Sequence, residues 1–246
     1  MSRERKSLTA RSVLASTLLG LDPPVLAVGR LVETAALFGI SEGTARTALS
    51  RMAAAGEVVA DGGDYRLTGR LLERQRRQDE GRRPRTRRWT GRWRLAVVTA
   101  DRRSAADRAD LRAALTRLRL AEWREGVWVR PDNLDIVPSG VSGEHCTWLT
   151  ADLDEPPPLD LWDLDGWAAG ARDLLDELTE QPPTIETLAP GFVLSAAVLR
   201  HLAADPMLPA DLLPADWPGE ELRATYDDWD RTYRGLLATW HRSRRG

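Results

Sequence analysis

The chain has 246 residues, of which 42% are hydrophobic and 29% are charged, and its formal net charge is only −2. Such a hydrophobic content excludes a disordered chain. No apolar run reaches the roughly 18 residues that a membrane-spanning helix needs. The single cysteine, Cys146, excludes an intrachain disulfide and fits a reducing compartment, so we expect a cytoplasmic protein. Three histidines and one cysteine are too few soft ligands for a structural zinc site.

The small net charge hides an uneven distribution of charged residues. Residues 1–94 contain 19 basic and 10 acidic side chains, a net charge of +9, whereas residues 95–246 contain 16 and 27, a net charge of −11. Within residues 150–230 the net charge reaches −16. All ten tryptophans lie from Trp89 onward, so the first module should have an aliphatic core. This asymmetry predicts a polyanionic partner for the N-terminal end.

Three helices are predicted in this N-terminal module. They span Thr9 to Leu19, Val28 to Phe38, and a segment that follows Ser41, which is a good N-cap. On the third helix a buried stripe is predicted from Ala45, Ala48, Leu49 and Met52. The opposite face presents hydroxyls and arginines, namely Thr44, Arg46, Thr47, Ser50 and Arg51. Such groups can contact phosphates and base edges of DNA; the alternative is an ordinary solvated helix with an arginine-rich surface.

A hairpin is predicted directly after the third helix. Two short apolar runs, at residues 58–60 and 65–67, flank an Asp-Gly-Gly-Asp turn. Three helices followed by a hairpin is the order of a winged helix-turn-helix, in which the third helix enters the major groove and the wing follows the DNA backbone. Arg66 and Arg70 would then contact phosphates. The arginines of residues 69–88 indicate either a solvated linker helix or further phosphate contacts.

The middle of the chain, residues 89–158, is predicted to be a small ferredoxin-like layer. Strands are expected at residues 93–99, 126–131 and 146–149, with a helix at residues 105–120, which gives the order β-α-β-β. Asp101 follows the first strand and could serve a metal-dependent nuclease, although a lone aspartate there is more often a turn residue. Adjacent residues on a strand face opposite ways, so His145 and Cys146 cannot act as a base–nucleophile pair. We expect no catalytic site and no metal or cofactor.

The last part, residues 159–246, is predicted to be an acidic, tryptophan-rich helical domain. Helices are expected at residues 161–178, 192–202 and 220–240, separated by proline-rich segments. Their many large apolar side chains favour a dimer interface or an apolar pocket, and a tryptophan-rich core is the alternative. The sequence therefore predicts an α+β multidomain protein with domains at residues 1–88, 89–158 and 159–246.

The chain resembles the PaaX-type repressors of phenylacetate degradation operons. The resemblance covers nearly the whole length and rests on the segments A-R-S-V-L, G-I-S-E-G-T-A-R-T-A-L-S-R-M, Y-R-L-T, W-T-G-R-W-R-L-A-V-V, E-G-V-W-V-R-P, L-W-D-L-D and D-P-M-L-P-A-D-L-L-P-A-D-W-P-G. It implies a winged helix, a ferredoxin-like middle domain and a helical C-terminal domain. It also implies a homodimer that binds palindromic operator DNA and is released by an aromatic acyl-CoA effector.

A CoA ester carries several negative charges, so the acidic region would have to supply local arginines to bind it. Arg172 and Arg200 are the candidate effector-binding residues. The leading hypothesis is a ligand-responsive transcriptional repressor of an aromatic-acid or related catabolic operon. Two alternatives are a nuclease that uses Asp101 and a C-terminal domain that recruits a protein partner instead of a small molecule.

Overall fold

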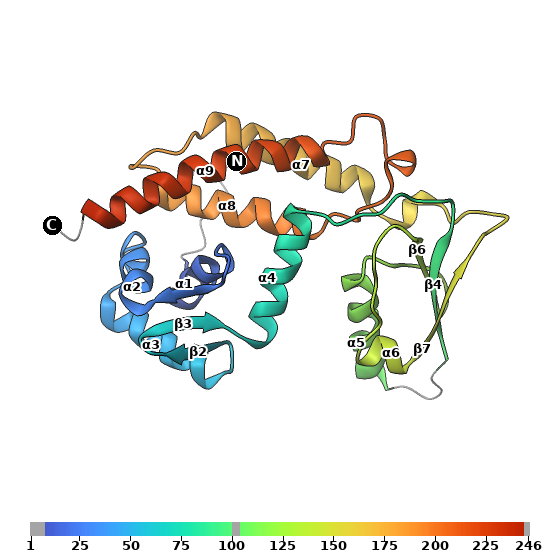
Figure 1. Cartoon of the computed structure of the whole chain (residues 1–246), viewed down its shortest axis with the longest axis horizontal. Coiled ribbons are helices and arrows are strands. Elements are labelled where there is room, and N and C mark those ends of the chain that lie inside the picture. The colour runs from blue at the N-terminus through green and yellow to red at the C-terminus, as the bar shows by residue number, and fades with distance from the viewer. Residues whose placement is uncertain (1–7, 100–103, 244–246) are drawn as a thin grey trace. The chain divides into compact units, whose positions relative to one another are not determined.

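The computed structural model describes residues 8–99 and 104–243 and shows a mixed α+β protein with two antiparallel sheets (Figure 1). Residue contacts divide the chain into two compact units. The first unit comprises Met1–Arg83, Ala171–Ala204 and Gly219–Gly246. The second comprises Pro84–Gly170 and Asp205–Pro218. The N-terminal helices thus share a compact unit with helices from the end of the chain.

The N-terminal part of the first unit contains the three predicted helices and the predicted hairpin. Its elements are α1 (Ala10–Leu19), β1 (Val25–Ala27), α2 (Val28–Ala36), α3 (Glu42–Ala54), β2 (Val58–Asp61), β3 (Asp64–Leu67) and α4 (Gly69–Arg82). Hydroxyl caps fix two helix starts, since Thr9 Oγ1 accepts from the Ser12 amide (3.1 Å) and Ser41 Oγ accepts from the Thr44 amide (3.3 Å). Helix α4 ends two residues before Pro84, because proline cannot continue the helical hydrogen bonds.

The three short strands of this region form one sheet in the order β1-β3-β2. In the hairpin Val58 pairs with Leu67 and Asp61 with Asp64, and both glycines of the turn have positive φ. This is the backbone conformation that a tight two-residue turn requires. The sequence did not predict β1, because three residues after a Pro-Pro pair are too few to show a strand period.

The core of this region is aliphatic, as predicted. Leu14, Leu18 and Leu31 are fully buried, together with Leu49 of α3 and Leu67 of β3. On α3 the predicted stripe is confirmed, with Ala45, Leu49 and Met52 buried and Ala48 partly buried. The opposite face of α3 is left to solvent.

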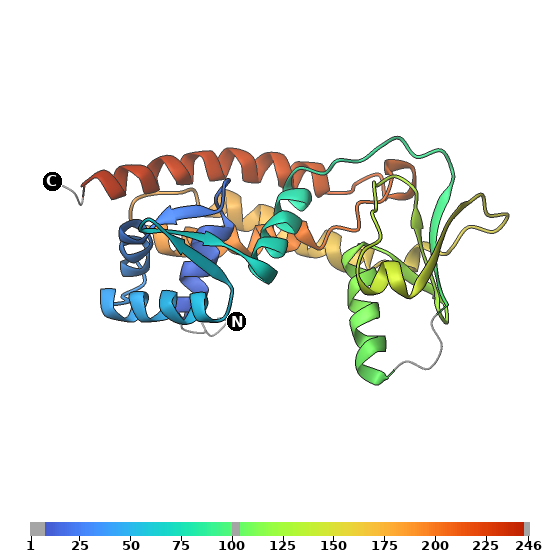
Figure 2. The same ribbon diagram turned by 60° about the horizontal axis from the view of Figure 1, so that its bottom comes forward.

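The remaining helices of the first unit are α8 (Leu188–Ala203) and α9 (Gly219–Ser243). Helix α7 (Leu164–Glu180) belongs to this unit from Ala171 onward. In two views α9 runs alongside α8 (Figures 1 and 2). Aromatic rings on α9 stack at successive turns, with 5.1 Å between the centroids of Trp229 and Tyr233. Gly191 of α8 lies against these two rings, where an added Cβ would be 2.9 Å from the Tyr233 ring. Only glycine lets the helices pack so closely there.

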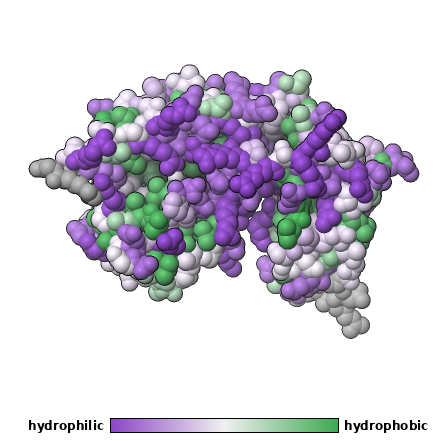
Figure 3. Space-filling view, in the orientation of Figure 1, coloured by the Kyte–Doolittle hydropathy of each residue, from purple (hydrophilic) through white to green (hydrophobic). Residues whose placement is uncertain are grey.

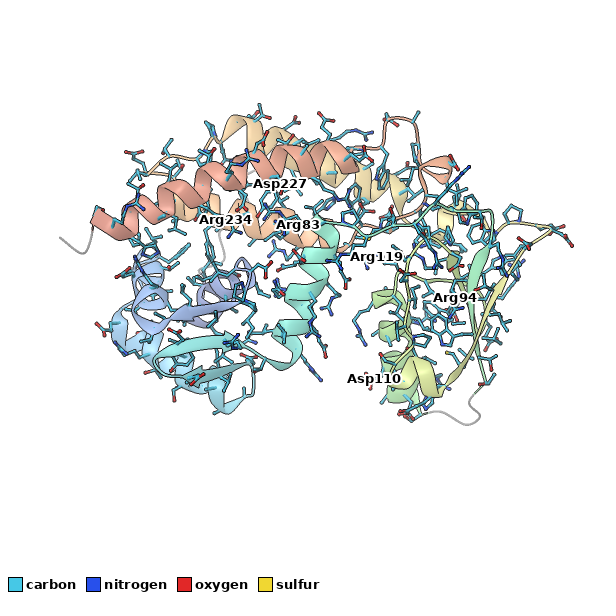
Figure 4. The ribbon with its side chains drawn as sticks, viewed as in Figure 1. Arg83, Arg94, Asp110, Arg119, Asp227 and Arg234 are labelled. Carbon is cyan, nitrogen blue, oxygen red and sulfur yellow. The ribbon has the colours of Figure 1, made fainter. Side chains whose placement is uncertain are left out.

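A buried ion-pair network joins α4 to α9. Arg82 Nη1 lies 2.8 Å from Asp230 Oδ2, and Arg82 Nε donates to Asp227 Oδ1 at 2.6 Å. Arg234 Nε lies 2.7 Å from the same Asp230 oxygen, and its Nη2 donates to the Gly20 carbonyl at the end of α1 (2.5 Å). Figure 4 shows Asp227 and Arg234 on the side of α9 near the C-terminal end of α4, where Arg83 lies. Asp230 is 3% exposed, so these partners are needed to offset the cost of burying its carboxylate.

The second unit is built on a four-stranded antiparallel sheet. Its elements are β4 (Trp93–Val98), α5 (Ala105–Arg117), β5 (Ala121–Arg124), β6 (Val127–Pro131), α6 (Val141–Glu144), β7 (Cys146–Ala151), η1 (Leu159–Leu161) and η2 (Ala210–Leu212). The strand order is β5-β6-β4-β7. The three predicted strands and the helix are present. Strand β5 and the short α6 were not predicted, because A-E-W-R alternates poorly and four residues make a single turn.

The buried side chain of Arg130 ties the proline-rich segment at residues 205–218 to this sheet. Its Nη2 donates to the carbonyl of Met207 (3.1 Å) and to Asn133 Oδ1 (2.8 Å). Asn133 Nδ2 donates to the same Met207 carbonyl (3.0 Å). The Met207 amide donates to Asp205 Oδ1 at 2.7 Å. Burial lowers the pKa of Arg130 to about 9, which leaves its guanidinium charged at neutral pH.

Replacing Asp230 should destabilise the first unit. Asp230→Asn keeps the size of the side chain but leaves two guanidinium groups without their shared carboxylate. We expect a loss of about 3–5 kcal/mol in the free energy of unfolding. Asp228→Asn removes an exposed partner of Arg231 on the same helix and should cost less than about 1 kcal/mol. Urea unfolding followed by tryptophan fluorescence measures both, and equal losses would contradict the assigned role of Asp230.

Replacing Arg130 should destabilise the second unit. Arg130→Ala leaves a cavity and removes donors from the Met207 and Pro131 carbonyls, so we expect a loss of about 3 kcal/mol or more. The control is Arg124→Ala, an exposed arginine that stacks on Trp123 and should cost about 0.5–1 kcal/mol. Thermal unfolding of the two variants compares them directly. Similar melting temperatures for Arg130→Ala and Arg124→Ala would show that the hydrogen bonds of Arg130 do not stabilise the packing of residues 205–218 on the sheet.

Candidate nucleic-acid interface

The candidate site is the exposed face of α3. All five residues predicted from the sequence on this helix are exposed, namely Thr44, Arg46, Thr47, Ser50 and Arg51. They are exposed because Ala45, Leu49 and Met52 occupy the buried face of the same helix. The helix therefore presents hydroxyls and guanidinium groups on one continuous surface. Whether they contact DNA remains a prediction.

Arg46 is held by a neighbour within α3. Its Nε lies 2.7 Å from Glu42 Oε1, one helical turn earlier, and both side chains are more than half exposed. An ion pair with this exposure contributes less than about 1 kcal/mol, so a phosphate or a guanine edge can compete for the guanidinium. Glu42 also lies at the helix N-terminus, where the helix dipole stabilises its carboxylate.

The two other predicted contacts lie outside α3. Arg66 is exposed in the middle of β3, the central strand of the sheet, and pairs in register with Val25 and Val59. Arg70 is exposed in the first turn of α4. Both belong to the compact unit that contains α3. The structure thus places all seven predicted DNA-contacting side chains on the surface of one unit.

Arg11 lies beside the exposed face of α3 and was not predicted. A groove of about 830 Å³ runs between the start of α1 and α3, and its lining includes Arg11, Thr44, Thr47 and Arg51. Arg11 donates from Nε to Glu57 Oε2 at 2.9 Å, and so is oriented by the segment that follows α3. In the sequence it is a single exposed arginine on a helix, which carries no signal of its own.

A second group of cations, Arg74, Arg77 and Arg200, comes from α4 and α8. Burial lowers the pKa of Arg74, and repulsion from Arg200, Arg77 and Arg11 lowers it further. Within residues 8–99 and 104–243, none of Arg74, Arg77 and Arg200 forms an ion pair. The positive charge of the α3 surface therefore extends through Arg11 to α4 and α8.

The arginines that follow in the sequence behave differently. Arg82 is 13% exposed and is engaged by Asp227 and Asp230. Arg87 lies 2.5 Å from Asp132 and 2.7 Å from Asp135 in the second unit. For these two residues the structure favours a structural role over the alternative of phosphate contacts.

The candidate effector residues do not line the cavities of about 480, 520 and 830 Å³ in the described part of the chain. Arg172 is exposed on α7 and Arg200 is exposed on α8. A cavity of about 480 Å³ at the Arg82–Asp230 network is lined by equal numbers of aspartates and arginines. A neighbouring cavity of about 520 Å³ is more apolar. Effector binding at Arg172 and Arg200 remains a prediction.

The structure adds no support to a nuclease. Asp101 lies outside the described residues. Among the residues that are described, no three histidines, cysteines, aspartates or glutamates gather as metal ligands. Cys146 is buried on β7 and His145 precedes it at the end of α6. Across the described parts of the chain, every helix is too short or too polar to cross a bilayer.

Comparison with known proteins gives three family matches and a close structural relative. Residues 9–71 match a family described as PaaX-like protein, residues 86–139 the PaaX protein central Cas2-like domain, and residues 162–242 the PaaX-like protein C-terminal domain. A solved structure, the uncharacterized protein Rv0674 from Mycobacterium tuberculosis, is 46% identical, with a TM-score of 0.73 over 95% of this chain and 99% of that one. No protein with a curated description matches the sequence. Because the three matches follow one another along the chain, it belongs to the PaaX-like protein family.

Proposed function

We propose that this protein is a sequence-specific DNA-binding transcriptional repressor, in which α1 to β3 form a winged helix. Membership of the PaaX-like family suggests a transcriptional regulator. The observation that carries the proposal is the exposed face of α3, which presents arginines and hydroxyls directly before a tight hairpin. In this arrangement α3 enters the major groove and the β2–β3 hairpin follows the backbone.

Each candidate side chain has a role that follows from its chemistry. The guanidinium groups of Arg46 and Arg51 match the acceptor pair on guanine, while Thr44, Thr47 and Ser50 can bond to base edges or phosphates. Arg66 and Arg70 bind phosphates beside the groove and fix the orientation of the protein. Arg11, Arg74 and Arg77 extend these phosphate contacts. The acidic C-terminal part repels DNA, which restricts contact to this surface.

The wider assembly is part of the same proposal. The protein acts as a homodimer in the cytoplasm, and its two α3 helices reach half-sites about 10 bp or a multiple apart.

The strand order β5-β6-β4-β7 supports a ferredoxin-like middle domain, since it arises from a β-α-β-β-α-β succession. The division at residues 1–88, 89–158 and 159–246 stays a prediction. A small-molecule effector, an aromatic acyl-CoA or a similar compound from an aromatic-acid pathway, releases the DNA.

Removing the arginines of α3 should abolish specific DNA binding. Each arginine that pairs with a guanine contributes about 1–3 kcal/mol, so Arg46→Ala with Arg51→Ala should weaken the operator affinity by 30-fold or more. The control replaces Arg108 and Arg117, two exposed arginines of α5, and should change the affinity little. Operators selected from random duplexes, followed by fluorescence anisotropy, provide the measurement. Retained specific binding by the α3 variant would show that another element reads the sequence.

Removing the α4 arginines should change the salt dependence of DNA binding. If Arg74 and Arg77 each contact one phosphate, their replacement by alanine makes the negative slope of log K against log [salt] shallower by about two. The affinity should fall by the same factor for operator and unrelated duplexes, because phosphate contacts carry no sequence information. Anisotropy titrations at several salt concentrations test this. An unchanged slope would place this group of arginines away from the DNA.

A further inference from the structure

A cavity of about 520 Å³ lies inside the first unit, between its N-terminal and C-terminal helices. Its lining comes from α1, β1 and α2 on one side and from α8 and α9 on the other. This volume falls within the range of pockets that hold small organic molecules. In the space-filling view, green atoms gather over the N-terminal helices, below a band of purple atoms along α9 (Figure 3).

Most of the cavity wall is apolar. Its apolar lining includes Leu26 of β1, Phe192 and Leu199 of α8, and Leu237 of α9. Phe192 is fixed in place by an edge-to-face contact with Phe38, with 5.2 Å between ring centroids. Ala196 and Ala238 contribute no bulk to the wall and leave the space open. An occupant with an apolar body would therefore be released from water on several sides.

The charged groups on the wall leave a positive edge. Asp230 is a lining carboxylate, but Arg82 and Arg234 already neutralise it. Arg30 Nη1 lies 3.1 Å from Glu33 Oε2, and His241 Nδ1 lies 2.6 Å from the same oxygen. The carboxylate of Glu33 is therefore shared by two side chains that line the cavity, Arg30 and His241.

Among the described residues, Arg242 is a lining cation without an acidic partner. It donates to Thr239 Oγ1 at 2.9 Å, and within the described parts of the chain it forms no ion pair. One guanidinium therefore remains at the edge of the cavity for an anion from outside the protein.

We infer that this cavity binds a small organic acid, with an apolar body against Phe192, Leu199 and Leu237 and a carboxylate near Arg30 and Arg242. The inference rests on the proposed function and narrows its effector to a free acid, because a carboxylate, and not the thioester of an acyl-CoA, can pair with these guanidinium groups. The occupant touches α2, which packs against α3, and also α8 and α9. A ligand bound in this cavity can therefore affect the position of α3 through α2.

The test uses the full chain and two matched probes, 2-naphthoate and the uncharged 2-naphthamide, in calorimetric titrations. We expect 2-naphthoate to bind at least tenfold more tightly than the amide. Replacing both Arg30 and Arg242 by glutamine should abolish this preference and leave binding of the amide unchanged. Equal binding of the two probes by the unmodified chain, or failure of both to bind, would overturn the inference.

A cavity-filling variant tests the location. Ala196→Phe places a ring in the cavity and should abolish binding of 2-naphthoate, whereas Val193→Phe adds the same ring at an exposed position of α8 and should not. Thermal unfolding checks that both variants fold. Equal effects of the two substitutions on binding would place the ligand elsewhere and overturn the assignment of this cavity.

Binding of duplex DNA at low salt, measured on the same preparations, keeps the two proposals separate. DNA binding without binding of 2-naphthoate contradicts the cavity inference alone. Binding of 2-naphthoate by a chain that does not bind DNA contradicts the proposed function and leaves the anion site standing.

Discussion

The buried carboxylate of Asp230 is the constraint on which the first unit depends. It lies on α9 and pairs with Arg82 at the end of α4 and with Arg234, which also binds the last turn of α1 through the Gly20 carbonyl. A buried carboxylate without such partners would be strongly unfavourable, so the three helices must stay together for the charge to be tolerated. Gly81 reinforces this arrangement, because an added Cβ there would lie 2.4 Å from the Leu202 carbonyl oxygen of α8.

This network also places the functional surfaces. By holding α1 and α4 against α8 and α9, it brings Arg200 into electrostatic range of Arg74, although Arg200 belongs to a strongly acidic stretch of sequence. It also closes one side of the apolar cavity, whose lining includes Asp230 and Arg234. A ligand in that cavity and DNA on α3 would therefore act on the same packed helices. The N-terminal part of the chain is basic on average and the C-terminal part acidic, but Arg200 is a basic residue of the acidic part that lies near the arginines of α4.

Much of the candidate interface was predictable because it depends on local periodicity. The spacing of Ala45, Leu49 and Met52 fixes which face of α3 is buried, and the exposed Thr47 and Arg51 follow from it. The Gly-Gly turn similarly predicted the hairpin. Strand β1, β5 and the short α6 were not predicted, because segments of three or four residues show no reliable period. Their pairing depends on neighbours distant in the sequence, such as β3 for β1.

The sequence by itself determined the longer helices and strands, their order, their charge and the faces that the N-terminal helices bury, since these follow from neighbouring residues. Only the tertiary structure decided which distant groups meet. The segments V-W-V-R-P and D-P-M-L-P stand far apart in the sequence, and the structure joins them through Arg130 and the Met207 carbonyl. Arg11, Arg74 and Arg200 likewise come together from three helices. Such contacts depend on how packed helices and strands satisfy buried charges and hydrogen bonds, which no local pattern encodes.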